Sequence, residues 1–395
     1  MRTRRATRNR YALVRTLTGA LCLLAAACSG GGSDAGSPGG PGGPGTEPSA
    51  FVVTGDFESG SFAALPLSDP ADGAVDLGPL HGDAVARSFG GLVYVVNRFG
   101  ADNIQAIDPA QGWRTLFQCS VGNGTNPHDI AFVSTDKAYV TLYEEAHLLI
   151  VDPTVGPTCE GFERGRIDLT PFADSDGLPE MDQMAVVDGK LFVALQRLDR
   201  NRFFEPSGTS TLVVIDTETD TFIDTRPETP GVDPIALRWT NPLGASRGLP
   251  IDPASGEIIV VQLGSFGELG DGGVETIHPT TFEHGRVLLS EEDLGLNLTD
   301  VAVVDGRIAW VIGTDESFRN FVVQVDMTLG EPLRTLFETD VYLTDLEFEP
   351  RHGTIWLTDR TFDAAGIRIF DAQDGSGFET IYATGLPPND IVFVE

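Results

Sequence analysis

The segment Asn126–Pro153, NPHDIAFVSTDKAYVTLYEEAHLLIVDP, contains three short apolar runs separated by turn residues. The runs are Asp129–Val133, Ala138–Leu142 and His147–Val151, and their β-branched and aromatic residues favour half-buried strands. Ser134–Lys137 forms a turn between the first two, and the final proline ends the third because it cannot donate to a ladder. We therefore expect three consecutive strands, which need neighbouring sheets to bury both of their faces.

The end-of-strand signal of this segment recurs along the chain. It is found at LSDP (67–70), IDP (107–109), VDP (151–153), IDT (215–217), IHP (277–279), VDM (325–327) and FDA (370–372). The spacings between successive signals are 39, 44, 64, 62, 48 and 45 residues. A period near 40–45 residues with four strands per unit is typical of a β-propeller, and the two long spacings indicate loop insertions.

The second strands of the units also align, as VYVVN (93–97), AYVTL (138–142), LFVAL (191–195), IIVVQ (258–262), IAWVI (308–312) and TIWLT (354–358). VYVVN, with NPHDIAF (126–132) and the later IVDP (150–153), resembles the YVTN-type β-propeller repeat of surface-layer and cell-surface proteins. The resemblance covers about residues 51–395. It implies a propeller architecture and says little about function, because propellers perform many unrelated tasks.

The two ends of the globular part complement each other. Residues 389–395 read as a first strand with nothing after it, whereas the N-terminal unit, with strands expected at 51–57, 61–67 and 74–80, lacks a first strand. Pairing these ends would remove the open sheet edge. We expect an all-β, seven-bladed β-propeller with Velcro closure of the C-terminal strand into the N-terminal blade, in a single domain over residues 50–395.

The N-terminus reads as an export signal. Residues 1–27 carry six Arg and no acidic residue, followed by a short apolar run that ends in small residues. Cys28 follows directly, so the leader resembles a bacterial lipoprotein signal with Cys28 as the lipidated residue; the alternative is an ordinary signal peptide cleaved near Ala27. Residues 28–49 form a Gly/Ser/Pro tether spanning about 25 Å. These features predict a lipid-anchored protein of the bacterial cell envelope, at the outer membrane, cell surface or periplasm.

The chain is strongly acidic. Loss of the six leader arginines from a net charge of −32 would leave −38, and Lys137 and Lys190 are the only lysines. This charge opposes binding to nucleic acid and to anionic headgroups and favours cations and cationic partners. The same composition is typical of secreted or salt-tolerant proteins. We expect a monomer.

Four cysteines are present, and two of them belong to the leader region. Cys22 would be removed with the leader and Cys28 would carry the lipid, which leaves Cys119 and Cys159. An oxidising compartment favours a disulfide between these two. The alternative is a pair of free thiols.

An acidic residue stands at or beside the start of most first strands. The set is Asp83, Asp129, Asp182 or Gln183, Asp300, Asp345 and Asp390, with Arg247 in the fifth unit. In propellers such positions line the mouth of the central channel. The carboxylates could cap the turns into their own strands, bind a cation or cationic ligand, or form a catalytic acid–base pair.

The loops after the second strands form another group. Each contains an arginine or an aromatic residue: Arg98-Phe99, Tyr143, Gln196 to Phe204, Phe266, Phe318-Arg319 and Arg360 to Phe362. These loops share a face with the starts of the first strands, so both groups should converge. Arg98, Arg319 and Arg360 could contribute to ligand or peptide recognition, or could only neutralise the acidic ring.

Two functional hypotheses follow. The first is a non-enzymatic binding platform for a protein, glycan or small ligand at the channel face, without a cofactor. The second is a calcium-dependent lactonase or esterase resembling the gluconolactonase and paraoxonase propellers, with oxygen ligands from Asp300, Asp345, Asn389, Asp390 and Asn126. No Glu stands at the first-strand positions, which favours the first hypothesis. The histidines show no metal-ligand spacing, and His128 is the one nearest to the expected channel mouth.

Overall fold

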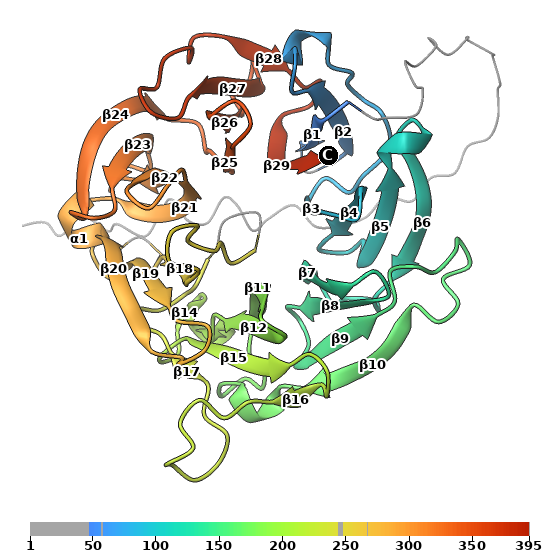
Figure 1. Ribbon diagram of the computed structural model, residues 1–395, viewed down its shortest axis with the longest axis vertical. Coiled ribbons are helices and arrows are strands. Elements are labelled where there is room, and N and C mark those ends of the chain that lie inside the picture. Colours follow the sequence, from blue (N-terminus) through green and yellow to red (C-terminus); the bar gives the residue numbers. More distant parts are fainter. Residues whose placement is uncertain (1–46, 57, 244–247, 267, 395) are drawn as a thin grey trace, which may run out of the picture. The chain divides into compact units, whose positions relative to one another are not determined.

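Seven sheets arranged in a ring make up the fold (Figure 1). The computed structural model describes residues 47–395 except 57, 244–247, 267 and 395. Each sheet is a blade of antiparallel strands, and the strand named first for each blade below lies nearest the centre of the ring. This arrangement confirms the expected seven-bladed propeller.

Blades 1 to 3 contain the following strands. Blade 1 is β29 (Pro388–Val394), β1 (Ser49–Gly55) and β2 (Gly60–Pro66). Blade 2 is β3 (Ala84–Phe89), β4 (Leu92–Asn97), β5 (Asn103–Asp108) and β6 (Arg114–Ser120). Blade 3 is β7 (Pro127–Ser134), β8 (Lys137–Leu142), β9 (His147–Val151) and β10 (Glu163–Asp168).

Blades 4 to 7 continue the ring. Blade 4 is β11 (Met181–Val187), β12 (Lys190–Leu195), β15 (Thr211–Asp216), β16 (Thr221–Phe222) and β17 (Ile235–Ala236). Blade 5 is β18 (Ile258–Gln262), β19 (Gly273–Ile277) and β20 (His284–Ser290). β18 holds the second-strand position of blade 5, because in the described chain the segment before it makes only isolated bridges to Ile258 and Gln262. Blade 6 is β21 (Asn297–Val303), β22 (Ile308–Thr314), β23 (Asn320–Asp326) and β24 (Glu331–Thr339). Blade 7 is β25 (Leu346–Glu349), β26 (Thr354–Asp359), β27 (Gly366–Asp371) and β28 (Ile381–Ala383).

Helical structure is sparse. Among the described residues, the single α-helical turn is α1 (Glu291–Leu294), in the connection from blade 5 to blade 6, and 3-10 turns lie at Pro70–Asp72, Pro109–Gln111, Thr170–Phe172 and Arg200–Arg202. A small hairpin, β13 (Leu198–Asp199) with β14 (Glu205–Pro206), extends the loop after β12. Within the described ranges, no helix has the length and apolar character needed to span a bilayer.

The ring is closed as the sequence predicts. β29 pairs antiparallel with β1, from Ser49 opposite Val394 to Thr54 opposite Pro388. The fourth strand expected at 74–80 is wrong, because this segment makes only isolated bridges at Ala74 and Leu80. Asp76 has a left-handed backbone (φ 54°) and Pro79 has no N–H to donate, so a regular ladder cannot form there.

Cys119 and Cys159 form the predicted disulfide. Cys119 lies in β6, the outermost strand of blade 2, and Cys159 lies just before β10 of blade 3. The bond therefore joins two neighbouring blades. In the chain-entropy description, closing a loop of 40 residues contributes roughly 4 kcal/mol to stability.

Candidate binding site at the channel mouth

First strands begin and second strands end on the same side of the ring, which we call the mouth face. A cavity of about 280 Å³ opens on this face. Its walls come from all seven blades or the loops that lead into them, including Asp83, Arg98, His128, Asp182, Leu243, Thr299, Tyr342, Thr344, Asn389 and Asp390. The two expected groups of residues thus converge here. Larger cavities of about 340 and 370 Å³ open at the other ends of the first strands. The walls of the larger one are mainly apolar, whereas Arg87, Glu349 and Arg351 also line the other.

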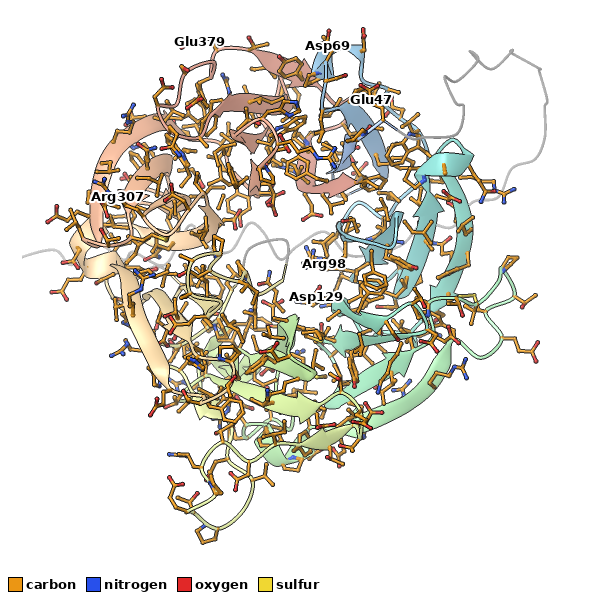
Figure 2. All side chains as sticks on the ribbon, viewed as in Figure 1. Glu47, Asp69, Arg98, Asp129, Arg307 and Glu379 are labelled. Atoms are coloured by element: carbon orange, nitrogen blue, oxygen red, sulfur yellow. A yellow bond between two sulfur atoms is a disulfide. The ribbon has the colours of Figure 1, made fainter. Side chains whose placement is uncertain are left out.

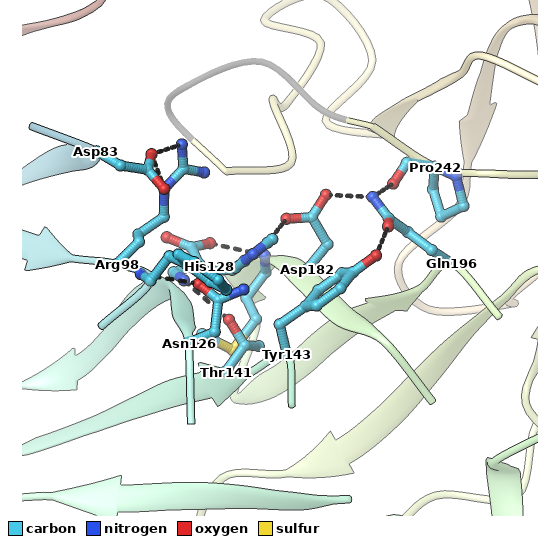
Figure 3. A network of polar contacts seen from close by, with 12 residues as sticks. Asp83, Arg98, Asn126, His128, Thr141, Tyr143, Asp182, Gln196 and Pro242 are labelled. Carbon is cyan, nitrogen blue, oxygen red and sulfur yellow. Dashed lines mark hydrogen bonds and ion pairs between the residues drawn. The ribbon is translucent and has the colours of Figure 1, made fainter. Parts of the chain in front are cut away.

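Arg98 and Asp83 form one polar element of the cavity. Nε and Nη2 of Arg98 donate to the same carboxylate oxygen of Asp83, at 2.9 and 2.5 Å. The pair is partly exposed to solvent. Its geometry keeps the guanidinium at the wall of the channel (Figures 2 and 3), where it can meet an acceptor on a ligand.

His128 belongs to a second element, a closed network of four side chains (Figure 3). Its Nδ1 lies 3.0 Å from Asp182 Oδ1, and the other oxygen of Asp182 accepts from Gln196 Nε2 at 2.9 Å. The hydroxyl of Tyr143 donates to Gln196 Oε1 at 2.9 Å, and the Tyr143 ring stacks on His128 at 4.2 Å. The imidazole is therefore fixed in orientation, with one ring nitrogen held by a carboxylate.

Burial and nearby carboxylates keep Tyr143 protonated. Desolvation raises the pKa of the Tyr143 hydroxyl, and the negative charges of Asp182 and Glu180 raise the pKa further. The hydroxyl consequently serves as a donor to Gln196 over the physiological range. Tyr143 and Gln196 were grouped by sequence with the loop arginines, but nothing in the sequence showed that they would turn inward.

Four aspartates of the predicted ring fasten neighbouring blades together. The second carboxylate oxygen of Asp300, Asp345, Asp390 and Asp129 accepts from a backbone N–H of the next blade, namely that of Leu346, Ile391, Ala86 and Met184. These bonds are 2.6–2.8 Å long. Each aspartate is nearly or fully inaccessible to solvent, so it acts as a clip between blades and lies behind the wall of the channel.

The clips define the register of the first strands. The equivalent positions in blades 2 and 4 are held by Val85 and Gln183. Asp83 stands two residues before the clip position of its blade and lines the cavity beside Arg98, and of the two candidates in blade 4 it is Gln183 that stands in register. Asp129 bonds its own neighbour Ile130 N–H through its other oxygen, because the preceding blade offers no carboxylate. Asp300 bonds Val301 N–H in the same way.

Burial shapes the acidity of these carboxylates. It raises the pKa of Asp129 despite the neighbouring Arg87. It also raises the pKa of Asp300, and the charge of Asp345 adds to the effect. For Asp390, burial and then Asp345 raise the pKa to about 8. These carboxylates accept backbone N–H groups, as turn caps do, but the N–H belongs to the next blade in all four cases and to the same strand only for Asp129 and Asp300.

The other candidates lie at different places. Arg319 pairs with Asp315 and Glu338, both at 3.3 Å, and points toward the outer strand β24. Arg360 donates to the carbonyl oxygens of Pro388 and Gly55, at 2.9 and 3.3 Å, and so ties blade 7 to blade 1. Arg247 lies outside the described residues.

The side chains expected as calcium ligands form hydrogen bonds or contacts with other residues of the protein. Asp300, Asp345 and Asp390 accept backbone N–H groups, and the side-chain oxygen of Asn126 accepts from Phe99 N at 3.0 Å. Asn389 contacts Arg360. In the part of the chain that the structure describes, no group of three or more His, Cys, Asp or Glu side chains is placed to hold a metal ion.

Comparison with known proteins supports the fold but assigns the chain to no family. No family model matches the sequence, and no curated protein matches it either. The hydrazine synthase of Kuenenia stuttgartiensis has a similar structure, with a TM-score of 0.54 and 16% identity over 76% of this chain and 86% of that one. A quinonprotein alcohol dehydrogenase-like protein of Bacteroides thetaiotaomicron gives 0.54 and 12%, covering 88% and 78%, and the Dos1 propeller gives 0.52 and 11%, covering 87% and 86%. At these identities the likeness shows the propeller fold alone.

Proposed function

We propose that this protein is a lipid-anchored propeller of the bacterial cell envelope that binds a ligand at the channel mouth and performs no catalysis. The observation that supports the proposal is the cavity of about 280 Å³ with walls from all seven blades. The Arg98–Asp83 pair and the His128 network present oriented polar groups to it. Preorganised donors of this kind favour binding, because little ordering entropy is lost when a ligand arrives.

The mouth is suited to a small polar ligand. Arg98 and His128 offer donors, whereas Thr299, Thr344 and Asn389 offer both donors and acceptors. The guanidinium and the imidazole are each backed by a carboxylate, so their positions do not depend on the ligand. A ligand with carboxylate or hydroxyl groups matches these donors best.

Replacing Arg98 or His128 should abolish ligand-induced stabilisation. We expect that small carboxylic acids or sugars which raise the melting temperature of the wild-type protein will no longer do so in Arg98→Ala and His128→Gln, because a ligand stabilises only the state that binds it. Arg114→Ala and His147→Gln, on outer strands, are matched controls and should respond like the wild type. An unchanged response in both mouth variants would refute binding at this site.

The same melting measurement tests the hydrolase alternative. A rise in melting temperature on adding Ca²⁺, lost when Asp300 and Asp345 are both replaced by Asn, would favour the calcium-dependent hydrolase. If these aspartates act only as clips, adding Ca²⁺ should leave the melting temperature unchanged in both the wild type and the double variant.

The anchor is proposed from the sequence alone, because Cys28 lies outside the described residues. Metabolic labelling with palmitate should mark the wild type and not Cys28→Ala, since a thioether-linked lipid needs this thiol. Cys22→Ala is the matched control and should be labelled like the wild type. Equal labelling of the Cys28 variant would contradict the anchor.

A further inference from the structure

Exposed aromatic side chains gather on the mouth face. Five of them follow second strands: Phe99 after β4, Phe203 after β12, Phe266 after β18, Phe318 after β22 and Phe362 after β26. We call these five the phenylalanine crown. Their exposed fractions range from 61% for Phe266 to 95% for Phe362. In the described chain, the strongly exposed aliphatic side chains lie instead on outer strands, on outer loops or at the opposite face.

The crown residues share one kind of loop, the loop that follows a second strand, although they stand between two and eight residues beyond the end of that strand. In blade 3, Tyr143 of the corresponding loop stacks on His128, whereas in blades 2, 4, 5, 6 and 7 a phenylalanine of that loop is exposed. Phenylalanine exposed singly on a surface is ordinary, whereas exposed phenylalanines in the corresponding loops of five blades make a pattern on one face. Exposed apolar groups that gather on one face mark interaction sites.

The fold itself does not explain these residues. Exposed rings bury little area, so they contribute little to the hydrophobic core. Phe203 and Phe318 have left-handed backbones, with φ of 59° and 62°, and bulky residues rarely adopt this conformation. Glycine or asparagine would adopt this backbone conformation more readily, so the phenylalanine lowers the stability of the isolated protein.

The charges around the crown indicate the chemistry of the partner that it would bind. Three described arginines of this face are held by the protein's own carboxylates, in the pairs Arg98–Asp83, Arg202–Glu205 and Arg319–Asp315. Exposed acidic residues stand within two positions of three crown rings: Glu268 by Phe266, Glu316 by Phe318 and Asp363 by Phe362. Together with a net charge of −32, this surface favours a partner that offers positive charge and apolar area.

Two other occupants fit less well. An anionic membrane is repelled by the acidic surface, and β1 begins at Ser49, which pairs with Val394 at the end of β29 that lies away from the crown. A second copy would bring two strongly negative surfaces together. A basic partner protein meets neither obstacle, and its Lys or Arg side chains can also lie over the faces of the phenylalanine rings.

We propose that the phenylalanine crown is the docking surface for a partner protein whose contact surface is basic and apolar. The proposal rests on the proposed role as a binding platform and names the chemistry of its protein partner. The aromatic rings supply buried area and cation–π contacts, and Glu268, Glu316 and Asp363 pair with the partner's cations. The crown lies on the same face as the channel mouth, and none of its five phenylalanines lines the cavity.

The probe is a designed peptide of alternating Arg and Leu, and a peptide of alternating Glu and Leu is the control of opposite charge. By fluorescence anisotropy, the wild type should bind the Arg/Leu peptide and not the Glu/Leu peptide. The triple variant Phe266→Ser, Phe318→Ser, Phe362→Ser should bind it about tenfold or more weakly, because aromatic anchors dominate interface energy. A charge variant, Glu268→Lys, Glu316→Lys, Asp363→Lys, should also bind weakly.

The control variant is Val75→Ser, Leu329→Ser, Leu333→Ser, which removes exposed apolar side chains elsewhere and should bind like the wild type. Arg98→Ala should keep peptide binding while losing the mouth ligand, so the two proposals fail separately. Equal peptide affinity of the crown variant and the wild type would overturn the crown. Two other results would also overturn it. If the wild type but not the crown variant sediments with phosphatidylcholine–phosphatidylglycerol vesicles, the crown binds a membrane. If the wild type but not the crown variant dimerises in sedimentation equilibrium, the crown binds a second copy.

Discussion

Deleting residues 390–395 is expected to unfold the whole propeller, because this segment contains most of the innermost strand of blade 1. Ile391, Val392 and Val394 are buried, and losing them removes roughly 5–9 kcal/mol of apolar burial at about 1.5–3 kcal/mol for each side chain. Typical domains have a net stability of only about 5–15 kcal/mol. The deletion also removes the clip from Asp390 to Ala86 N–H and leaves Asp345 without its partner Ile391 N–H.

Thermal melting followed by circular dichroism measures this effect. Shortening the exposed loop of blade 4 by residues 228–231 is the matched control, since these residues are exposed, and the control should melt cooperatively near the wild-type temperature. A soluble truncation at residue 389 that melts cooperatively would show that ring closure is not needed for folding.

Stability should fall as the pH rises from about 4 to about 8, and Asp390 should account for part of this fall. The pKa of Asp390 is raised to about 8 in the folded protein, whereas an unfolded Asp titrates near 3.9. Between these values the folded state holds a proton that the unfolded state has lost, so the free energy of unfolding decreases with pH. The contribution is fully present below about pH 4 and is lost as the pH passes through about 8.

Asp390→Asn should flatten this dependence, because an amide does not ionise. Each unit of pKa difference corresponds to about 1.4 kcal/mol, so the variant should exceed the wild type in stability at pH 8. Denaturant unfolding at pH 5 and pH 8 makes the comparison. Asp69→Asn, at the rim (Figure 2), is the control, since Asn and Asp cap equally well. A wild type and an Asp390 variant with parallel pH profiles would contradict a protonated Asp390.

The strands could be predicted because their chemistry is local. Short apolar runs bounded by turn residues, such as LFVAL (191–195) after Asp188-Gly189, identify strands such as β12. The register of the acidic ring could not be predicted. The sequence does not show which residue of a first strand lies beside the backbone of the next blade. Asp83 stands two positions before Val85 and therefore meets Arg98 rather than the next blade.

The channel network was partly hidden for a similar reason. His128 could be noticed because it precedes Asp129, but its carboxylate partner is Asp182, from a different blade. Contacts across blades depend on how the ring is closed, and propensity or spacing within one unit does not record them. The disulfide was accessible to prediction because only two cysteines were left once the leader region was set aside.

The ring is fastened differently at the junction between blades 2 and 3. No carboxylate clip runs from Val85, and this junction instead has the Arg87–Asp129 ion pair at 2.8 Å and, at the outer edge, the Cys119–Cys159 bond. Apart from the chain segment 121–126 that links β6 to β7, the two blades are held together before oxidation by noncovalent contacts alone. The strength of this junction therefore depends on the redox state of the two thiols, and a reducing environment leaves it with the ion pair and the packing contacts.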